Sequence, residues 1–205
     1  MKKQSIIGLF ALLLVFGACD TLDDNKTALQ SAEITQEAEK RSERGNERGA
    51  PAPGSESIAE IAIGAGFSEL VGALVYVDEE LGAGLVDLFL NGKDQYTVFA
   101  PTNEAFEGLY EFLGIVEITD LPAELVLDVL FYHVVEGRRA SNSVVPPRNP
   151  RTITTLLGAT FSVDRDAVIT DIAGQEVNII APNISASNGI IHVIDTVILP
   201  IDLEH

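Results

Sequence analysis

The sequence is poor in the residue types on which several common protein classes depend. Its 205 residues include one Cys and no Trp, and 13 basic side chains are outnumbered by 31 acidic ones, a formal net charge of −18. A single Cys excludes a disulfide framework and a multi-Cys zinc site. Binding to nucleic-acid phosphates requires clustered Lys and Arg side chains, so the acid excess excludes a nucleic-acid-binding protein.

The composition nevertheless predicts a folded domain. Hydrophobic residues make up 46% of the chain, which is too many for a fully disordered protein. A chain of 205 residues suits one domain of about 150 residues with extensions. Composition and charge divide it into residues 1–18, 19–55 and 56–203.

Residues 1–18 have the pattern of a secretory signal peptide. Two lysines precede the apolar run Ser5–Ala18, which is shorter than the about 20 helical residues that span a bilayer. The segment Phe16–Cys19 resembles the lipobox of bacterial lipoproteins, with Phe16 in place of the usual Leu. That resemblance implies cleavage before Cys19 and a lipid on this residue that anchors the protein to a membrane. The alternative is an ordinary secretory signal in which Cys19 is incidental.

Residues 19–55 are predicted to form a disordered tether. From Asp20 to Ser55 there are 8 acidic and 5 basic residues, and the stretch ends in GNERGAPAPGS, a composition typical of linkers. Asp20, Asp23 and Asp24 resemble the sorting signals of lipoproteins in two-membrane envelopes. We therefore expect a bacterial cell-envelope protein that is anchored through Cys19 and faces the periplasm or the exterior.

Residues 56–203 are predicted to form one α+β domain, because helical periodicity comes first and strand patterns follow. One helix is expected from Ser57 towards Gly64, and a second opens at Phe67 and Ser68. A third runs through Leu81 and Phe89 and is closed by Asn91 and Gly92, a fourth is Glu104–Leu113, and a fifth has Pro122 near its first turn and carries Leu125 to Leu130. Expected strands are Tyr96–Ala100, Thr152–Leu156, Thr160–Val163, Ala167–Thr170, Glu176–Ile180 and Ile190–Leu199. A capping box at Ser57 and a turn at Asn188 and Gly189 add local support.

Three longer stretches are more specific than this periodicity. They are YTVFAPTNEAF at Tyr96–Phe106, LFYHVVEG at Leu130–Gly137 and SNGIIHVIDTVILP at Ser187–Pro200. In this order and spacing they resemble the fasciclin (FAS1) domain, over about residues 57–201. The resemblance implies a fasciclin-like β-sandwich or wedge with an N-terminal helical layer. The stretch Tyr76–Gly84 is longer than is usual in the family, and the integrin-recognition peptides of animal members have no clear counterpart.

The resemblance also implies a function, namely a binding or adhesion module that contacts a protein or a surface polysaccharide. Self-association is a further option. The family's Tyr-His segment is associated with adhesion, so Tyr132 and His133 are the candidate binding residues, and core packing is their alternative role. Some fasciclin-like proteins bind carotenoids, so the alternative function is a carrier of a small apolar ligand. The low aromatic content of 6% offers no stacking platform for such a ligand.

Catalytic and metal-binding interpretations have little support. His133, His192 and Asp195 could be assembled into a metal site, and Ser141 or Ser187 could complete a catalytic triad. The chain lacks HExxH, GxSxG and a phosphate-binding Gly-rich loop. A His within an apolar strand is typically neutral and hydrogen-bonded. We therefore expect no catalytic residue, no metal ligand and no cofactor, and we expect that the protein is not an enzyme.

Overall fold

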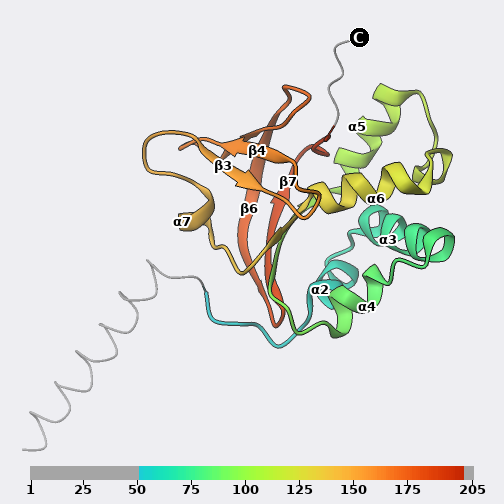
Figure 1. Cartoon of the computed structure of the whole chain (residues 1–205), viewed down its shortest axis with the longest axis horizontal. Helices are drawn as coiled ribbons and strands as arrows, with labels where there is room; N and C mark the ends of the chain where they lie inside the picture. The colour runs from blue at the N-terminus through green and yellow to red at the C-terminus, as the bar shows by residue number, and fades with distance from the viewer. Residues whose placement is uncertain (1–50, 201–205) are drawn as a thin grey trace, which may run out of the picture. The chain divides into compact units, whose positions relative to one another are not determined.

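A computed structural model describes residues 51–200, in which helices come first and most strands follow (Figure 1). The helices are α2 (Ile58–Gly64), α3 (Ser68–Leu81), α4 (Leu85–Asn91), α5 (Asn103–Leu113), the 3-10 helix η1 (Ile118–Asp120), α6 (Ala123–Tyr132) and α7 (Ser141–Val144). The strands are β1 (Tyr96–Pro101), β2 (Val134–Glu136), β3 (Arg151–Thr154), β4 (Thr160–Val163), β5 (Val168–Thr170), β6 (Glu176–Ala186) and β7 (Gly189–Ile194). The α+β class is confirmed.

Local capping chemistry begins two of the helices. The Ser57 hydroxyl accepts a hydrogen bond from the Glu60 N–H at 3.2 Å, and the Glu60 carboxylate accepts one from the Ser57 N–H at 2.7 Å. This is the predicted capping box of α2. The Thr102 hydroxyl likewise accepts a bond from the Ala105 N–H at 3.2 Å and begins α5.

The predicted helix over Leu81–Asn91 begins only at Leu85. Gly82 and Gly84 have φ values of 63° and 73°, which end α3 and reverse the chain direction. The Asp78 carboxylate then accepts hydrogen bonds from the first two N–H groups of α4, at 2.7 and 2.9 Å. A side chain near the end of one helix therefore caps the start of the next.

The seven strands form one mixed sheet in the order β2-β1-β7-β6-β5-β4-β3. The pair β1 and β7, second and third in this order, is parallel, with Phe99 opposite His192, and the other neighbouring strands are antiparallel. All residues of β7 are buried, as expected for a strand covered on both faces. Only glycine fits at Gly189, because a Cβ there would lie 2.1 Å from the Tyr96 carbonyl oxygen.

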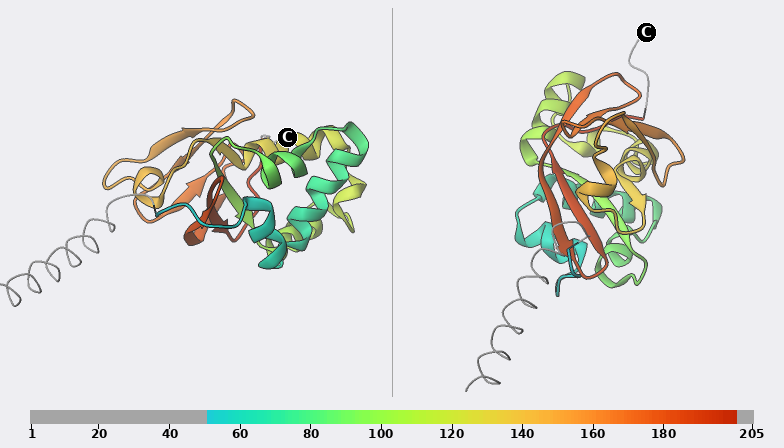
Figure 2. Two further views of the ribbon diagram at one scale, coloured as in Figure 1. Left: turned by 90° about the horizontal axis from the view of Figure 1, so that it is seen from below. Right: turned by 90° about the vertical axis from the view of Figure 1, so that its left-hand side faces the viewer.

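Two hydrophobic cores lie on opposite faces of this sheet. Val98 belongs to the core beneath the helices, and its neighbour Phe99 belongs to the second core, because successive strand residues point to opposite faces. All seven strands contribute buried residues to the second core, so the sheet folds over to enclose it. Figure 2 shows the helices at one end of the domain and the folded sheet at the other. The predicted wedge with a helical layer is confirmed.

Several strand boundaries differ from the prediction. Strand β7 ends at Ile194, before the predicted Leu199. At the next residue, the Asp195 carboxylate accepts hydrogen bonds from the backbone and side-chain N–H groups of Asn178, at 2.9 and 2.7 Å. Strand β6 continues through Pro182 to Ala186. Two register shifts and the positive φ of Asn183, 66°, accommodate the proline.

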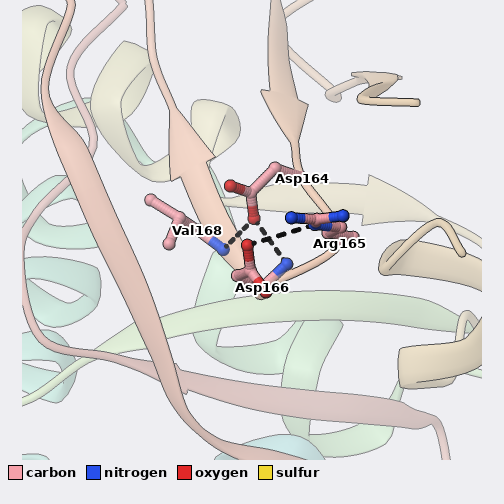
Figure 3. A network of polar contacts seen from close by, with 4 residues as sticks. All are labelled: Asp164, Arg165, Asp166 and Val168. Carbon is pink, nitrogen blue, oxygen red and sulfur yellow. Dashed lines mark hydrogen bonds and ion pairs between the residues drawn. The ribbon is translucent and has the colours of Figure 1, made fainter. Parts of the chain in front are cut away.

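The turn between β4 and β5 is built by one aspartate (Figure 3). The Asp164 carboxylate accepts hydrogen bonds from the N–H groups of Asp166 and Val168, at 2.8 and 2.9 Å. Arg165 and Asp166 form the one ion pair found between residues 51 and 200, at 3.5 Å. Both partners are highly exposed, so the pair contributes little to stability.

The packed domain begins before the predicted boundary at residue 56. The Gly54 N–H donates a hydrogen bond to the Ala186 carbonyl oxygen at 3.2 Å, so residues 51–55, assigned to the tether, lie against β6. The signal peptide and the rest of the tether lie outside the described residues. Within residues 51–200 no helix has the length and hydropathy needed to cross a membrane.

Candidate functional site

The Tyr132-His133 pair lies at the end of α6, inside the domain. Tyr132 is 0% exposed and His133 is 3% exposed. The Tyr132 hydroxyl donates a hydrogen bond to the Thr160 carbonyl oxygen at 3.0 Å, and its ring packs edge-on against Phe161 with centroids 5.9 Å apart. Burial raises the pKa of Tyr132 to about 12. Neither side chain is accessible to a partner, so the geometry favours the core-packing role over direct contact in adhesion.

His133 joins α6 to the chain that follows β7. Its Nδ1 lies 2.7 Å from the Val129 carbonyl oxygen, and its Nε2 accepts a hydrogen bond from the Ile198 N–H at 3.2 Å. The neutral tautomer with the proton on Nδ1 satisfies both contacts. Burial lowers the pKa of His133 to about 4, although the Val129 carbonyl favours the charged form. The imidazole is therefore neutral at physiological pH.

His192 lies on β7 and has partners other than those of His133. It is fully buried, its Nδ1 accepts a hydrogen bond from the Asn183 N–H at 3.3 Å, and its Nε2 lies 2.9 Å from the Arg139 carbonyl oxygen. Burial lowers the pKa of His192 as well. In His133 and in His192, both ring nitrogens therefore have a backbone hydrogen-bond partner.

The other candidate catalytic residues are also held in structural contacts. Asp195 caps Asn178, and the Ser141 hydroxyl accepts a hydrogen bond from the Asn183 amide at 2.7 Å. Ser187 is exposed and makes its contacts through its backbone, whose N–H donates to the Glu56 carbonyl oxygen at 2.7 Å. Among residues 51–200 no three His, Cys, Asp or Glu side chains are grouped so as to hold a metal ion. Cys19, the predicted lipid-attachment residue, lies outside the described residues.

Two adjoining apolar cavities lie within the helical layer. The larger, of about 150 Å³, is lined by side chains of α2, α3, α4, α6, β1 and β2. The smaller, of about 90 Å³, lies between α3, α5, α6 and the chain that follows β7. Leu70, Leu130 and His133 border both, and His133 is the only polar residue in either lining. A cavity of about 150 Å³ lined by aliphatic side chains holds a ligand of the size of benzene.

A groove of about 550 Å³ opens on the outer face of α3, and we call it the α3 groove. Its apolar lining includes Ile63, Phe67, Val71 and Val75. Ile63 is 63% exposed. Ile63, Val71 and Val75 also line the larger cavity, so the groove and this cavity share apolar side chains.

Exposed large hydrophobic side chains are concentrated in this layer. Seven of the nine such residues in the described part of the chain belong to α2, α3, α4, α5 or the loop after α5, and two belong to the sheet end. The seven are Ile63, Val75, Leu81, Leu90, Phe112, Leu113 and Val116. Of these seven, Ile63 and Val75 lie together in the lining of the α3 groove.

Charge is divided unevenly between the two ends of the domain. Residues 51–128, which form α2 to α5, β1 and most of α6, contain 15 acidic residues and one basic residue. Residues 129–200, which include the remaining strands, contain 6 acidic residues and 5 arginines. The helical layer therefore carries almost all of the net negative charge, and its field extends around the α3 groove.

These features define a class of protein, a wedge-shaped α+β domain with an apolar groove on an acidic helical layer. The family model of the fasciclin domain matches residues 66–200, so the chain belongs to the fasciclin domain family. Fasciclin domains are adhesion-type modules of cell-surface proteins.

Similar proteins come from several sources. The chain is 38% identical over 149 residues to protein sll1483 of Synechocystis, covering 70% of this chain and 73% of that protein. It is 36% identical over 118 residues to the cell surface glycolipoprotein MPB83 of Mycobacterium bovis, covering 57% of this chain and 48% of the relative. It thus spans about half the length of this mycobacterial relative. A FAS1 domain pair from the insect cell adhesion molecule fasciclin I matches 64% of this chain and 45% of that one, with 21% identity and a TM-score of 0.49.

Sequence patterns missed two features of the surface. Val71 and Val75 face outward because of the way α3 packs on its neighbours. Apolar residues occur on several sides of this helix, so its sequence pattern does not show which side packs inward. Arg138 makes most of its contacts with residues that lie close only in the folded chain, the farthest separated by 87 positions in sequence. An arginine after a short strand carries no recognisable signal of such contacts.

Proposed function

We propose that the protein is a membrane-anchored binding or adhesion module of the bacterial cell envelope, without catalytic activity, that contacts a protein or a surface polymer. The observation that carries this proposal is the α3 groove, an open apolar surface in a layer that holds most of the exposed large hydrophobic side chains. Soluble monomeric domains seldom expose contiguous apolar surface without a partner. Membership of the fasciclin domain family supports the same function.

The groove and its surroundings suit a particular kind of interface. Protein interfaces typically have an apolar, desolvated centre and a polar rim. Ile63 and Val75 would supply the centre, and acidic side chains such as Glu79 of α3 would supply the rim. A partner with basic groups around an apolar segment is complementary to this surface. Its association rate should fall as salt concentration rises, because the acidic field that attracts it is screened.

Attachment to the membrane forms the second part of the proposal. The lone Cys19 follows the apolar signal-like run, and a lipid on this residue would anchor the mature chain without a protein span. MPB83 of Mycobacterium bovis, which is similar to this chain, bears the name cell surface glycolipoprotein. Cell fractionation with surface proteolysis tests the anchor. Wild type should stay with membranes and Cys19→Ala should be released, and equal retention of the two would refute lipid anchoring at Cys19.

A matched pair of surface variants tests the binding face. Ile63 in the α3 groove is 63% exposed and Ile180 in β6 is 53% exposed, so replacing either by Ser leaves the core intact. Beads carrying residues 19–205 would be mixed with labelled envelope fragments from the source bacterium. Loss of an apolar anchor typically costs about 1–3 kcal/mol, so Ile63→Ser should reduce binding about tenfold while Ile180→Ser binds like wild type. Equal binding by all three proteins would refute a role for the groove.

The apolar cavities favour a second candidate function, a carrier of a small apolar ligand. Their linings are apolar except for His133, and the α3 groove adjoins the larger one through shared lining residues. Drug-sized ligands occupy pockets of about 300–1,000 Å³, so cavities of about 150 and 90 Å³ suit a much smaller molecule than a carotenoid unless the helices separate. Native mass spectrometry and an absorbance scan of protein purified from its source test this function. A bound pigment or apolar molecule would favour the carrier.

A further inference from the structure

An exposed loop at the sheet end combines prolines with arginines. This loop, Pro147–Arg151, has the sequence PRNPR and leads from α7 into β3, and its first four residues are exposed. We call it the PRNPR loop. Both of its ends are held by the fold, because Val145 packs against the second core and the Arg151 guanidinium donates a hydrogen bond to the Ser143 carbonyl oxygen. Prolines also restrict the backbone, so the loop loses little conformational freedom when a partner binds it.

The PRNPR loop lies in a basic stretch of an otherwise acidic domain. Residues 137–163 contain four arginines and no acidic residue, and Arg148 is the exposed one of the four. The acidic residues that follow, Asp164 and Asp166, are engaged in the turn between β4 and β5 (Figure 3). Since Arg165–Asp166 is the one ion pair among residues 51–200, the Arg148 guanidinium is available to a carboxylate of another molecule.

The surface that suits this loop lies on the helical layer. Beside the α3 groove is a second groove of about 440 Å³, and residues of α3 and η1 line both. We call it the glutamate groove, because its lining includes Glu69, Glu107 and Glu117. The α3 groove contributes the ring of Phe67 and aliphatic side chains. Apolar surface and carboxylates are therefore adjacent on this face, and they are complementary to a segment of prolines and arginines.

The PRNPR loop and the two grooves lie at opposite ends of the domain. In Figure 1 the chain from α7 to β3 loops out at the sheet end, on the left, and α3 and α5 lie on the right. The left-hand view of Figure 2 shows the same separation of the sheet end from the helices. A loop that is held at both ends cannot cross the domain to the grooves of its own molecule. It can meet only the grooves of another copy.

We infer that the PRNPR loop of one copy docks on the α3 groove and the glutamate groove of a second copy. The inference rests on the proposed binding function and deepens it by naming the partner. Pro147 and Pro150 cover the apolar lining of the α3 groove, and Arg148 meets the carboxylates of the glutamate groove. Because the contact joins two different faces, a bound pair still presents one free loop and one free set of grooves. The contact therefore extends into a row of copies and does not close as a dimer.

The excess of acidic residues gives this association a distinctive salt dependence. Residues 51–200 contain 21 acidic and 6 basic side chains, so two copies repel each other at long range. The Debye length is about 30 Å at about 0.01 M salt and about 8 Å at about 0.15 M, so salt removes this repulsion before it weakens contacts of a few ångströms. Self-association should therefore be stronger at about 0.15 M than at about 0.01 M salt. A partner that is basic overall follows the opposite trend.

Sedimentation velocity tests the inference on a reference protein, residues 19–205 with Cys19→Ser, which cannot form disulfide-linked dimers. We expect its average sedimentation coefficient to rise between about 10 µM and about 0.5 mM, a range suited to weak contacts, and to pass the value of a dimer. A monomer at every concentration, or a plateau at the dimer, would overturn the inference. Association that is stronger at about 0.01 M than at about 0.15 M salt would also overturn it.

Three variants of the reference protein separate the two faces from the overall charge. Ile63→Ser in the α3 groove and Arg148→Glu in the PRNPR loop should each weaken self-association about tenfold. Lys93→Glu makes the same change in net charge as Arg148→Glu at an exposed position outside the loop and both grooves, and it should associate like the reference protein. Equal effects of Arg148→Glu and Lys93→Glu would show that charge alone is responsible and would overturn the inference.

A mixture of Ile63→Ser and Arg148→Glu gives the sharpest result. The first variant keeps an intact loop and the second keeps intact grooves, so the two should form a dimer with the affinity of the reference contact and no longer row. Absence of this dimer would overturn the inference.

These outcomes are distinguishable from failure of the proposed function. If the reference protein stays monomeric while Ile63→Ser loses binding to envelope fragments, the α3 groove has a different partner and only the inference fails. If Ile63→Ser changes neither self-association nor binding to envelope fragments, the proposed binding face fails as well.

Discussion

The sharpest quantitative prediction concerns His133, the histidine of the family's Tyr-His segment. Its ring is 3% exposed and both ring nitrogens are engaged by backbone groups of Val129 and Ile198. Protonating Nε2 would remove the acceptor for the Ile198 N–H and place a charge in an apolar core. Stability should therefore fall as the pH approaches the range in which this imidazole gains a proton.

The size of the effect follows from the two pKa values of His133. Burial lowers the pKa from 6.5 to about 4 in the folded state, so between these values the unfolded chain binds more protons than the folded one. The stability contribution is fully present above pH 6.5 and is lost as the pH falls toward 4. At 1.36 kcal/mol per pKa unit, the loss is about 3 kcal/mol in total, and most of it has occurred by about pH 4.5.

Urea unfolding of wild type and His133→Asn at about pH 7 and about pH 4.5 measures this loss. The variant lacks the titrating group and should lose about 2–3 kcal/mol less stability between the two pH values than wild type does. All other titrating groups, His192 included, are common to both proteins and cancel in the comparison. Identical pH dependence in the two proteins would refute the assignment of His133 as a buried neutral residue.

Three further changes test other parts of the structure. Asn188→Ala removes two buried hydrogen bonds, at 2.8 and 2.9 Å, to backbone groups of α2 and α4. In urea titrations it should lower the free energy of unfolding by about 2–5 kcal/mol. A loss below about 1 kcal/mol would contradict the role of this side chain. Gly189→Ala forces a methyl group against the Tyr96 carbonyl, so we expect no cooperative unfolding transition when unfolding is followed by circular dichroism. A cooperative transition like that of wild type would show that the pairing of β1 with β7 accommodates the methyl group. Benzene should raise the melting temperature of wild type by occupying the larger cavity. Ala62→Leu fills part of that cavity and should remove the rise. An equal rise in wild type and Ala62→Leu would show that benzene binds elsewhere.

Local chemistry explains which parts of the fold could be predicted from the sequence. The caps at Ser57 and Thr102 and the tight turn at Asn188 involve residues within a few positions of one another, so their signals survive in the linear sequence. Strand β2 has three residues and becomes a strand only by pairing with β1. The continuation of β6 past Pro182 likewise depends on tertiary pairing with β7 that no local preference reveals.

The candidate site was less predictable than the fold. The apolar surroundings of His133 and His192 correctly indicated neutral, hydrogen-bonded rings, because a charged imidazole in such a setting lacks compensation. The α3 groove depends on how α2, α3 and η1 pack around one another. Arg138 makes contacts with Pro51 and Gly189 that only the folded chain creates. The uneven distribution of charge is visible in the sequence, but only the structure shows which end of the wedge carries the excess of acidic residues.

The most direct test of the central claim is photo-crosslinking in cells of the source organism. A benzoylphenylalanine residue would replace either Ile63 in the α3 groove or Ile180 on the sheet end, two positions of similar exposure, 63% and 53%. A binding module that uses its helical layer predicts a crosslinked envelope component at residue 63 and none at residue 180. Crosslinks at residue 180 alone, or equally at both positions, would contradict the account.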